Sequence, residues 1–420
     1  MALGFSGFLP NALIGLLSII ILVYAADKVV EKMQGVAKAF GVSEVVIAMT
    51  IVSIGTSLPE ISLHVVASFK ILLSSGLPLE IFGTDLFTFL MGSHMEILQG
   101  LAEKGLEISK AESVYLQQSG TVLGASIGSD VVQETLVIGL VIISSALLAG
   151  RKNFRFSRKF LIRDYAPMVG TSLITIFLAL NWKGLFNFFS GGALNVSGTL
   201  TRLDGLILVG SFVAYMYYLY TTRDEKLAEQ GDMEASERPL IDLSVGLFMM
   251  LLVIMSADVF LGVVEVAIAE TGLSGSMIGV ATVGIVSAFP EMITAISGLR
   301  QGSEGISLGT LVGSNITNPL LAIGSGAVIS TYAVPRPAIL WDLPMEVVLA
   351  GLPVLYMFKR DRIGDLLSKP AEKLGLEKTA EKLEGAENQV LSIAGAVVLI
   401  MLYFVYLYIR FRYFPHDFRT

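Results

Sequence analysis

The chain has 420 residues, of which 54% are hydrophobic and only 15% charged, and its mean hydropathy is +0.72. A soluble chain carries about a quarter charged residues, so this composition excludes a water-soluble globular protein and predicts an all-α polytopic membrane protein. The absence of cysteine excludes disulfides and thiolate metal sites, and the net charge of −7 leaves no basic surface for nucleic acid.

Runs of about 20 apolar residues predict ten transmembrane helices. The N-terminal run has no lysine or arginine before it, so we interpret it as a first span and not as a removable signal. The predicted spans are 9–27, 43–69, 120–149, 165–181, 203–221, 241–268, 273–299, 306–331, 337–358 and 389–409.

The basic residues are distributed unevenly about these spans. If the N-terminus lies outside, the links after the odd-numbered helices face the cytoplasm and contain 20 of the 29 lysines and arginines. This bias predicts a multi-pass protein of the cell membrane with both termini outside, although Arg410, Arg412 and Arg419 near the C-terminus oppose it.

Two motifs each occur twice in the chain. Residues Gly41–Glu60 align without gaps to Gly272–Glu291, and Gly124–Asp130 aligns to Gly309–Asn315. Each half of the chain contains five predicted spans. Because five is odd, the second half enters the membrane from the opposite side, which predicts two repeats of inverted topology, a common architecture of transporters.

The spacing of the motifs differs between the halves, because the first copy contains an additional segment at 72–118. That segment has six acidic residues and two lysines, which favours an amphipathic surface helix, with an external cation-attracting cover as the alternative. The predicted organisation is a first five-helix repeat at 1–221, a cytoplasmic linker at 222–240, and a second repeat at 241–420 with a cytoplasmic link at 359–388.

Glu60 and Glu291 occupy matched positions deep in apolar spans, each directly after a proline. A carboxylate at that depth costs several kcal/mol unless it is paired or solvated, so its presence in both copies indicates function. Pro59 and Pro290 each leave a backbone carbonyl without its helical donor, and such carbonyls are tolerated where they line a cavity or bind an ion. Hydroxyls from Thr56, Ser57 and Ser287 precede these prolines.

The second motif combines small and polar residues. Its Gly-x-x-x-Gly spacing predicts close helix packing and by itself indicates nothing more. In the first copy, Ser129 and Gln133 lie one turn apart on one helix face, and Asp130 and Glu134 form a similar pair rotated by one residue. The corresponding residues of the second copy are Ser314, Asn318, Asn315 and Pro319.

Together these residues predict a hard, all-oxygen cation site. Calcium prefers six to eight oxygen ligands, and two carboxylates neutralise a divalent charge in a low-dielectric setting. His64 lies one turn after Glu60. A histidine at such a place is more often a packed group than a ligand, so we assign it at most to the ion pathway.

The motifs resemble those of the cation/calcium antiporter superfamily, and most closely its sodium/calcium exchanger branch. The residues that carry the resemblance are Gly55–Glu60, Gly128–Asp130, Pro290–Glu291 and Gly313–Asn318. The resemblance implies ten helices in two inverted halves, alternating access around a central site, no cofactor and no enzymatic activity. The metal ligands that it implies are Glu60, Glu291, Thr56, Ser57, Ser287, Ser129, Gln133, Ser314 and Asn318.

The chain departs from the family pattern at several positions. Asp130 stands where asparagine is usual, and Ala288 replaces a hydroxyl residue. Sodium-coupled members often have an aspartate at one of the positions of Gln133 and Asn318, where this chain has two amides. The sequence therefore leaves both Na⁺ and H⁺ as candidates for the coupled ion. Asp130 and Glu134 are candidates for the missing negative charge, and Asn315 is a further candidate on the ion pathway.

Two other function classes compete with an antiporter. Cation channels usually gather acidic side chains from several subunits around one axis, whereas here both glutamates come from inverted copies in one chain. An intramembrane enzyme is disfavoured because the sequence contains neither a nucleophile elbow nor a His-Glu-x-x-His motif.

Overall fold

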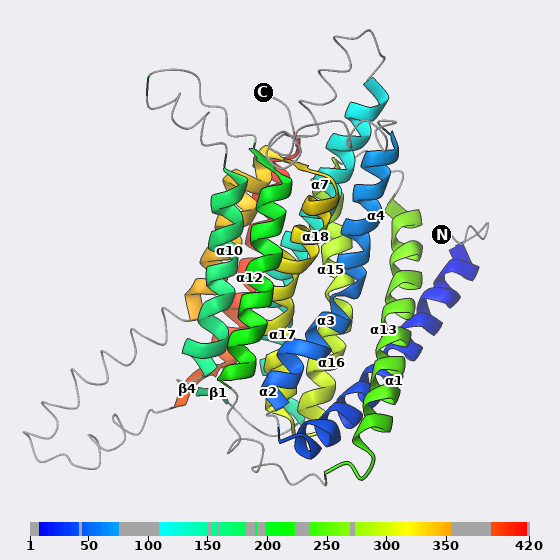
Figure 1. The fold of residues 1–420 in the computed structure, drawn as a ribbon, viewed down its shortest axis with the longest axis vertical. Coiled ribbons are helices and arrows are strands. Elements are labelled where there is room, and N and C mark those ends of the chain that lie inside the picture. Colours follow the sequence, from blue (N-terminus) through cyan, green and yellow to red (C-terminus); the bar gives the residue numbers. More distant parts are fainter. Residues whose placement is uncertain are drawn as a thin grey trace, which may run out of the picture.

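The computed structural model describes residues 8–41, 44–74, 109–148, 153–157, 160–180, 190, 198–222, 235–268, 274–353 and 388–417. These residues form a bundle of long helices whose short strands lie at its two ends (Figure 1). β1 (Asn153–Ser157) pairs antiparallel with β4 (Asn388–Ser392), and β2 (Gly198–Leu200) pairs antiparallel with β3 (Tyr332–Val334).

The helices of the first half follow the predicted order. They are α1 (Phe8–Ala39), α2 (Glu44–Ile47), η1 (Ala48–Val52), α3 (Ser53–Thr56), α4 (Leu58–Ser74), α7 (Ser109–Val132), η3 (Gln133–Val137), α8 (Ile138–Leu148), η4 (Leu161–Tyr165), α10 (Ala166–Ala179) and α12 (Arg202–Thr221), where η denotes a π-helical turn.

The second half of the chain adds a further set of helices to the bundle. They are α13 (Pro239–Ile268), α14 (Gly275–Ile278), η6 (Gly279–Val283), α15 (Gly284–Ser287), α16 (Phe289–Arg300), α17 (Glu304–Thr317), η7 (Asn318–Ile323), α18 (Gly324–Ile329), η8 (Ala338–Asp342) with the helix that continues it through residue 353, and α21 (Ile393–Tyr413).

Among the described residues, six helices are long and apolar enough to cross a membrane, and the bent pair Val45–Thr56 and Leu58–Ser74 makes a seventh. The chain is therefore a multi-pass membrane protein. The first part of α13, Pro239–Val253, is a shorter apolar helix. The count of ten spans remains a prediction.

The helices α1 and α7 extend by more than ten residues beyond the predicted spans. α1 continues to Ala39 because Val29, Val30 and Met33 are buried on its inner face, whereas Glu31 is exposed. α7 begins at Ser109, so the last residues of the predicted insertion at 72–118 belong to this helix. The first residues of the insertion belong to α4, which ends at Ser74. Residues 75–108 of the insertion and 359–387 of the second link lie outside the described part of the chain.

The repeated motifs have the same local structure. In both copies of the first motif a helical turn, a π-helical turn and a second helical turn precede a break, at Ser57 and at Ala288. The prolines after these breaks begin new helical segments, as expected for a residue that lacks an N–H donor. The first break bends the span by 44°, whereas Gly275–Arg300 runs as one span.

The two halves pack against each other through their glycines. A side chain at Gly128 would meet the Val280 backbone at 2.7 Å, and one at Gly313 would meet Met49 at 2.8 Å. α7 therefore crosses the first motif of the second half, and α17 crosses the first motif of the first half. This confirms the close packing that the Gly-x-x-x-Gly spacing predicts.

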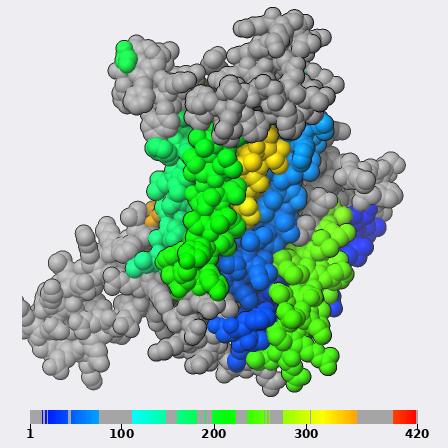
Figure 2. Space-filling model, in the orientation of Figure 1, coloured from blue at the N-terminus to red at the C-terminus, as the bar shows by residue number. Residues whose placement is uncertain are grey.

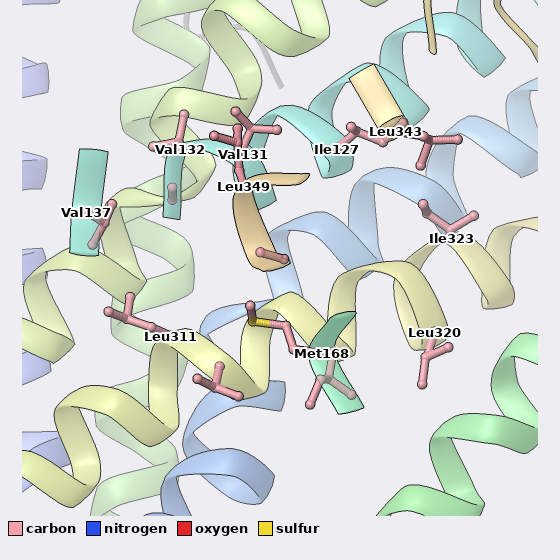
Figure 3. Packing of buried hydrophobic residues seen from close by; sticks show 14 of the residues in the cluster. Ile127, Val131, Val132, Val137, Met168, Leu311, Leu320, Ile323, Leu343 and Leu349 are labelled. Carbon is pink, nitrogen blue, oxygen red and sulfur yellow. The ribbon is translucent and has the colours of Figure 1, made fainter. Parts of the chain in front are cut away.

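Apolar side chains fill the space between these crossing helices. Ile127, Val131 and Leu311 are each at most 2% exposed and belong to one large cluster that Figure 3 shows from close by. The outer surface is also apolar: Val213 and Tyr217 of α12 and Phe248 of α13 are exposed. Both helices are visible in Figure 2, α12 in green and α13 in yellow-green. Such a surface suits lipid contact.

Candidate functional site

The two predicted glutamates lie at matched helix starts in the interior of the bundle. Glu60 is in the first turn of α4 and Glu291 is in the first turn of α16, and they are 1% and 0% exposed. Each helix start follows a break, so its free N–H groups and dipole favour a negative charge there. Local structure thus supports two buried carboxylates.

Hydroxyl groups from different elements surround these carboxylates. Ser129 of α7 donates a hydrogen bond to Glu60 Oε1 at 3.2 Å, and Ser287 of the second half lies within electrostatic range of the same carboxyl. Thr56 and Ser57 of the first half lie within range of the Glu291 carboxyl, which also interacts with Glu60. Each glutamate therefore has hydroxyls of the opposite half nearby, and Glu60 also has Ser129 of its own half.

Gln133 connects the second motifs of the two halves. Its Nε2 donates to Ser129 Oγ at 3.1 Å, and its Oε1 accepts hydrogen bonds from Ser314 Oγ and from Asn315 Nδ2, the latter at 3.2 Å. Gln133 is also the first residue of η3, and Asn318 is the first residue of η7. π-helical turns often occur at functional sites, and here they place both amides in the interior.

Many of the oxygens at this site have no hydrogen-bond partner. They are Glu60 Oε2, both carboxylate oxygens of Glu291, and Ser57 Oγ, Thr294 Oγ1, Asn315 Oδ1 and Asn318 Oδ1. Buried polar atoms are nearly always paired, because an unpaired one costs several kcal/mol in an apolar setting. A set of unpaired, mostly acceptor oxygens around two carboxylates is suited to binding a hard cation.

The structure links most of the predicted ligands through hydrogen bonds and close contacts. Glu60, Glu291, Thr56, Ser57, Ser287, Ser129, Gln133 and Ser314 are linked by the contacts above. Asn318 donates from Nδ2 to Asp130 Oδ1 at 2.8 Å, and its Oδ1 is among the unpaired oxygens.

His64 does not take part in these contacts. Its Nδ1 lies 3.0 Å from the Tyr332 hydroxyl and its Nε2 lies 2.8 Å from Ser126 Oγ, and the ring is fully buried. Both ring nitrogens are therefore satisfied by links to β3 and α7. This placement fits a packed group and gives no support to the assignment of His64 to the ion pathway.

The sequence motifs do not include several polar residues that lie near the site. Thr294 follows Glu291 by one turn and is buried, and Glu346 is a buried carboxylate after η8. Glu346 was detectable as an acid within the apolar run 337–358, but it has no repeated partner. Asp342 and Arg410 form a buried ion pair at 3.0 Å, and neither residue belongs to a repeated motif.

The comparisons with known proteins agree on one family. The family model of the sodium/calcium exchanger protein matches residues 11–93, 107–221 and 243–412. The sodium/calcium exchanger MaX1 of Methanosarcina acetivorans is 24% identical over 374 residues, covering 83% of this chain and 91% of that protein. The inner membrane protein YrbG of Escherichia coli is 23% identical over 357 residues, covering 82% and 88%.

The fold is also similar to a solved structure. The sodium/calcium exchanger from Methanococcus jannaschii superposes with a TM-score of 0.57 at 18% sequence identity, covering 95% of this chain and 97% of that one. This likeness concerns the arrangement of the helices, whereas the family model covers most of the sequence. The chain is therefore a membrane protein of the sodium/calcium exchanger family.

Proposed function

We propose that this protein exchanges Ca²⁺, or a similar divalent cation, for Na⁺ by alternating access around the paired glutamates. The observation that carries the proposal is the pair of buried carboxylates, Glu60 and Glu291, whose unpaired oxygens are lined by hydroxyls of both halves. Two carboxylates balance one divalent charge, and their oxygens supply the ligands that calcium prefers.

The direction of the helices supports a transporter mechanism. In Figure 1 the chain rises from α2 to α4 but descends from α15 to α16, so the matched motifs run in opposite directions. We infer two inverted five-helix repeats, at 1–221 and 241–420, joined by a cytoplasmic linker at 222–240. Opening the site first to one side and then to the other follows from rocking one set of helices against the other.

The proposal also concerns the identity of the coupled ion. The names of related proteins, such as the exchanger MaX1, favour sodium. The amides at Gln133 and Asn318 remove charge from the central site, so a proton gradient is the alternative driving force. We also propose the cell membrane as the location, with both termini outside.

The test is calcium uptake by the protein reconstituted in liposomes. An outward sodium gradient is expected to drive uptake of radioactive calcium, and an outward proton gradient alone is not. Glu60→Gln and Glu291→Gln are each expected to reduce uptake at least 100-fold, because either substitution leaves a divalent ion with one carboxylate in an apolar setting. Glu237→Gln, at an exposed glutamate, is the matched control.

Each alternative has its own signature in this assay. Uptake under the proton gradient alone would identify a proton/calcium antiporter. Calcium flux that is independent of both gradients and carries current would identify a channel. Uptake that survives in both glutamine variants would overturn the role of the paired glutamates.

A further inference from the structure

Four buried polar side chains form a hydrogen-bonded network one helical turn from the central site. They are His64 and Ser68 of α4, Ser126 of α7 and Tyr332 of β3, and we call these four residues the polar bridge. Each of them is fully buried. His64 Nε2 lies 2.8 Å from Ser126 Oγ, and His64 Nδ1 lies 3.0 Å from the Tyr332 hydroxyl. The polar bridge therefore joins three elements that are far apart in the sequence.

The Tyr332 hydroxyl is the centre of the polar bridge. It also lies 2.8 Å from Ser68 Oγ and donates to the backbone carbonyl of His64 at 3.2 Å. Ser68 Oγ in turn donates to the carbonyl of Gly326 in α18 at 2.9 Å. Gly326 leaves room for the phenol, because a Cβ atom at this position would overlap the Tyr332 hydroxyl. One hydroxyl thus holds β3, α4 and α18 together.

The polar bridge lies next to the central site, toward one end of the bundle. α4 and α7 contact each other at two successive levels: Ser129 donates to Glu60, and one turn further along α4 His64 contacts Ser126. In Figure 1 both helices continue from there to the end of the bundle at which the C-terminus lies. A route from this end to Glu60, between α4, α7 and α18, is therefore closed by the polar bridge.

The equivalent positions of the second half are apolar. The alignments that match Glu60 to Glu291 and Ser129 to Ser314 extend to three members of the polar bridge. The equivalents of His64, Ser68 and Ser126 are, in this order, Ala295, Leu299 and Leu311, all of them buried. If the network served only to pack a motif helix on its neighbour, both halves would need it. Its restriction to one half indicates a task that belongs to one end of the protein.

A closure made of hydrogen bonds is suited to repeated opening. When the helices that it joins separate, water can replace each lost hydrogen bond, so the polar groups are satisfied in the closed and in the open state. A closure made of apolar side chains would instead expose apolar surface to water each time it opened. Alternating access requires a closure of the first kind on a side that opens.

We propose that the polar bridge is a gate, which closes the central site toward the end of the bundle where α4 ends and opens when the Tyr332 hydroxyl leaves α4. This inference rests on the proposed alternating access and names contacts that hold one of its two states. The members of the polar bridge are positioning residues and bind no ion. Loss of their hydrogen bonds favours the state that is open at this end.

The first test measures accessibility and does not depend on transport. The chain contains no cysteine, so a single introduced cysteine reports labelling without background. Ala67 is buried and lies two turns after Glu60 on the same face of α4. In the purified full-length protein, labelling of Ala67→Cys by a water-soluble maleimide is expected to become at least tenfold faster when Tyr332→Phe is added.

The matched control is Tyr403→Phe, which removes a buried hydroxyl that has no hydrogen-bond partner. It is expected to leave the labelling rate of Ala67→Cys unchanged. Equal labelling rates in Tyr332→Phe and Tyr403→Phe would overturn the proposal.

A reporter in the other half separates opening of a gate from general loosening of the bundle. Ala295 is buried one turn after Glu291 on α16, which runs toward the opposite end. Labelling of Ala295→Cys is expected not to become faster in Tyr332→Phe, because opening at one end accompanies closure at the other. Faster labelling at both Ala67→Cys and Ala295→Cys would refute the gate and leave the hydroxyl a purely stabilising role.

A second variant acts on the gate from another element. Gly326→Ala keeps every hydrogen-bonding group and displaces the Tyr332 hydroxyl by the overlap described above. It is expected to accelerate labelling of Ala67→Cys at least threefold, while the protein elutes as one species on size exclusion. Protection of Ala67→Cys that persists in both Tyr332→Phe and Gly326→Ala would exclude the polar bridge as a gate.

Transport then separates this inference from the proposed function. With calcium supplied at the end where α4 ends, Tyr332→Phe is expected to lower the maximal exchange rate and the calcium concentration for half-maximal exchange, each at least threefold, because the open state binds calcium readily but closes less often. A lower maximal rate with an unchanged half-maximal concentration would indicate loss of active protein and contradict the gate. The expected labelling pattern in a protein that exchanges no calcium would refute the proposed function and leave the gate standing.

Discussion

At the scale of single residues, Gln133 has the most consequential position. It contacts Ser129 on its own helix and Ser314 and Asn315 on the opposite half, so one amide orders hydroxyls from both second motifs. The relation between Ser129 and Gln133 follows from their spacing of one helical turn. The contacts with Ser314 and Asn315 depend on how α7 and α17 cross, which no spacing within one helix specifies.

Gln133→Ala is expected to raise the calcium concentration for half-maximal exchange about tenfold, because it removes buried hydrogen bonds that position the Ser129 hydroxyl beside Glu60. Calcium dependence of exchange in proteoliposomes measures this change. Gln117→Ala, at an exposed glutamine of the same helix, is the control. A calcium dependence in Gln133→Ala equal to that of the control would contradict the ordering role of Gln133.

The repeated motifs allowed prediction of the paired glutamates, whereas Glu346, which has no repeated partner, was missed. Glu60 and Glu291 are conspicuous because each copy supports the other. Glu346 occurs once, in an apolar run, and its proximity to Asp130 and Glu134 depends on the packing of three separate spans. Asn318 was predicted as a ligand of the central site; its amide nitrogen donates to Asp130, which no motif spacing predicts, and its amide oxygen is left unpaired.

At the scale of elements, the two motifs form a crossed pair in which glycines replace side chains at the contact. Gly124 lies against Ser276, and Gly128 lies against Val280, so α7 approaches the backbone of α14 and η6 directly. The Gly-x-x-x-Gly spacing predicted a close approach, but it left the partner helix undetermined. The partner is the first motif of the opposite half.

Gly128→Ala is expected to destabilise the protein by about 1–3 kcal/mol, because the new methyl group would overlap the Val280 backbone, which cannot rotate away as a side chain can. A lower midpoint of thermal unfolding in detergent, followed by size exclusion with fluorescence detection, measures the effect. Gly210→Ala on α12 is the matched control, since nothing lies within 4 Å of its new methyl group. Equal midpoints for the two variants would argue against a tight crossing.

At the scale of the whole molecule, the C-terminal segment is attached to the start of a motif helix. Asp417 accepts a hydrogen bond from the backbone N–H of Ser276 at 2.9 Å, and also from the side chains of Ser274 and Ser276. Arg410 of α21 pairs with Asp342 at 3.0 Å. These contacts join α21, η8 and α14, and they were not predictable because their residues are far apart in the sequence.

Arg410→Gln is expected to lower stability by about 3–5 kcal/mol, because it leaves the Asp342 carboxylate buried without its charge partner. The thermal midpoint in detergent is the measurement, and Arg412→Gln, at an exposed arginine on the same helix, is the control. Addition of Asp342→Asn to Arg410→Gln is expected to restore part of the loss. A midpoint that falls further in the double variant would show that the ion pair is not the cause.

The crossed packing of the halves has a consequence for expression of the protein in pieces. Since α7 packs on the first motif of the second half and α17 packs on that of the first, neither half contains its own packing partner. A polypeptide cut between α12 and α13 is expected to yield two fragments that are degraded when produced separately. Produced together in one cell, they are expected to associate and recover calcium exchange, because the interface, and not the peptide bond, holds them in register.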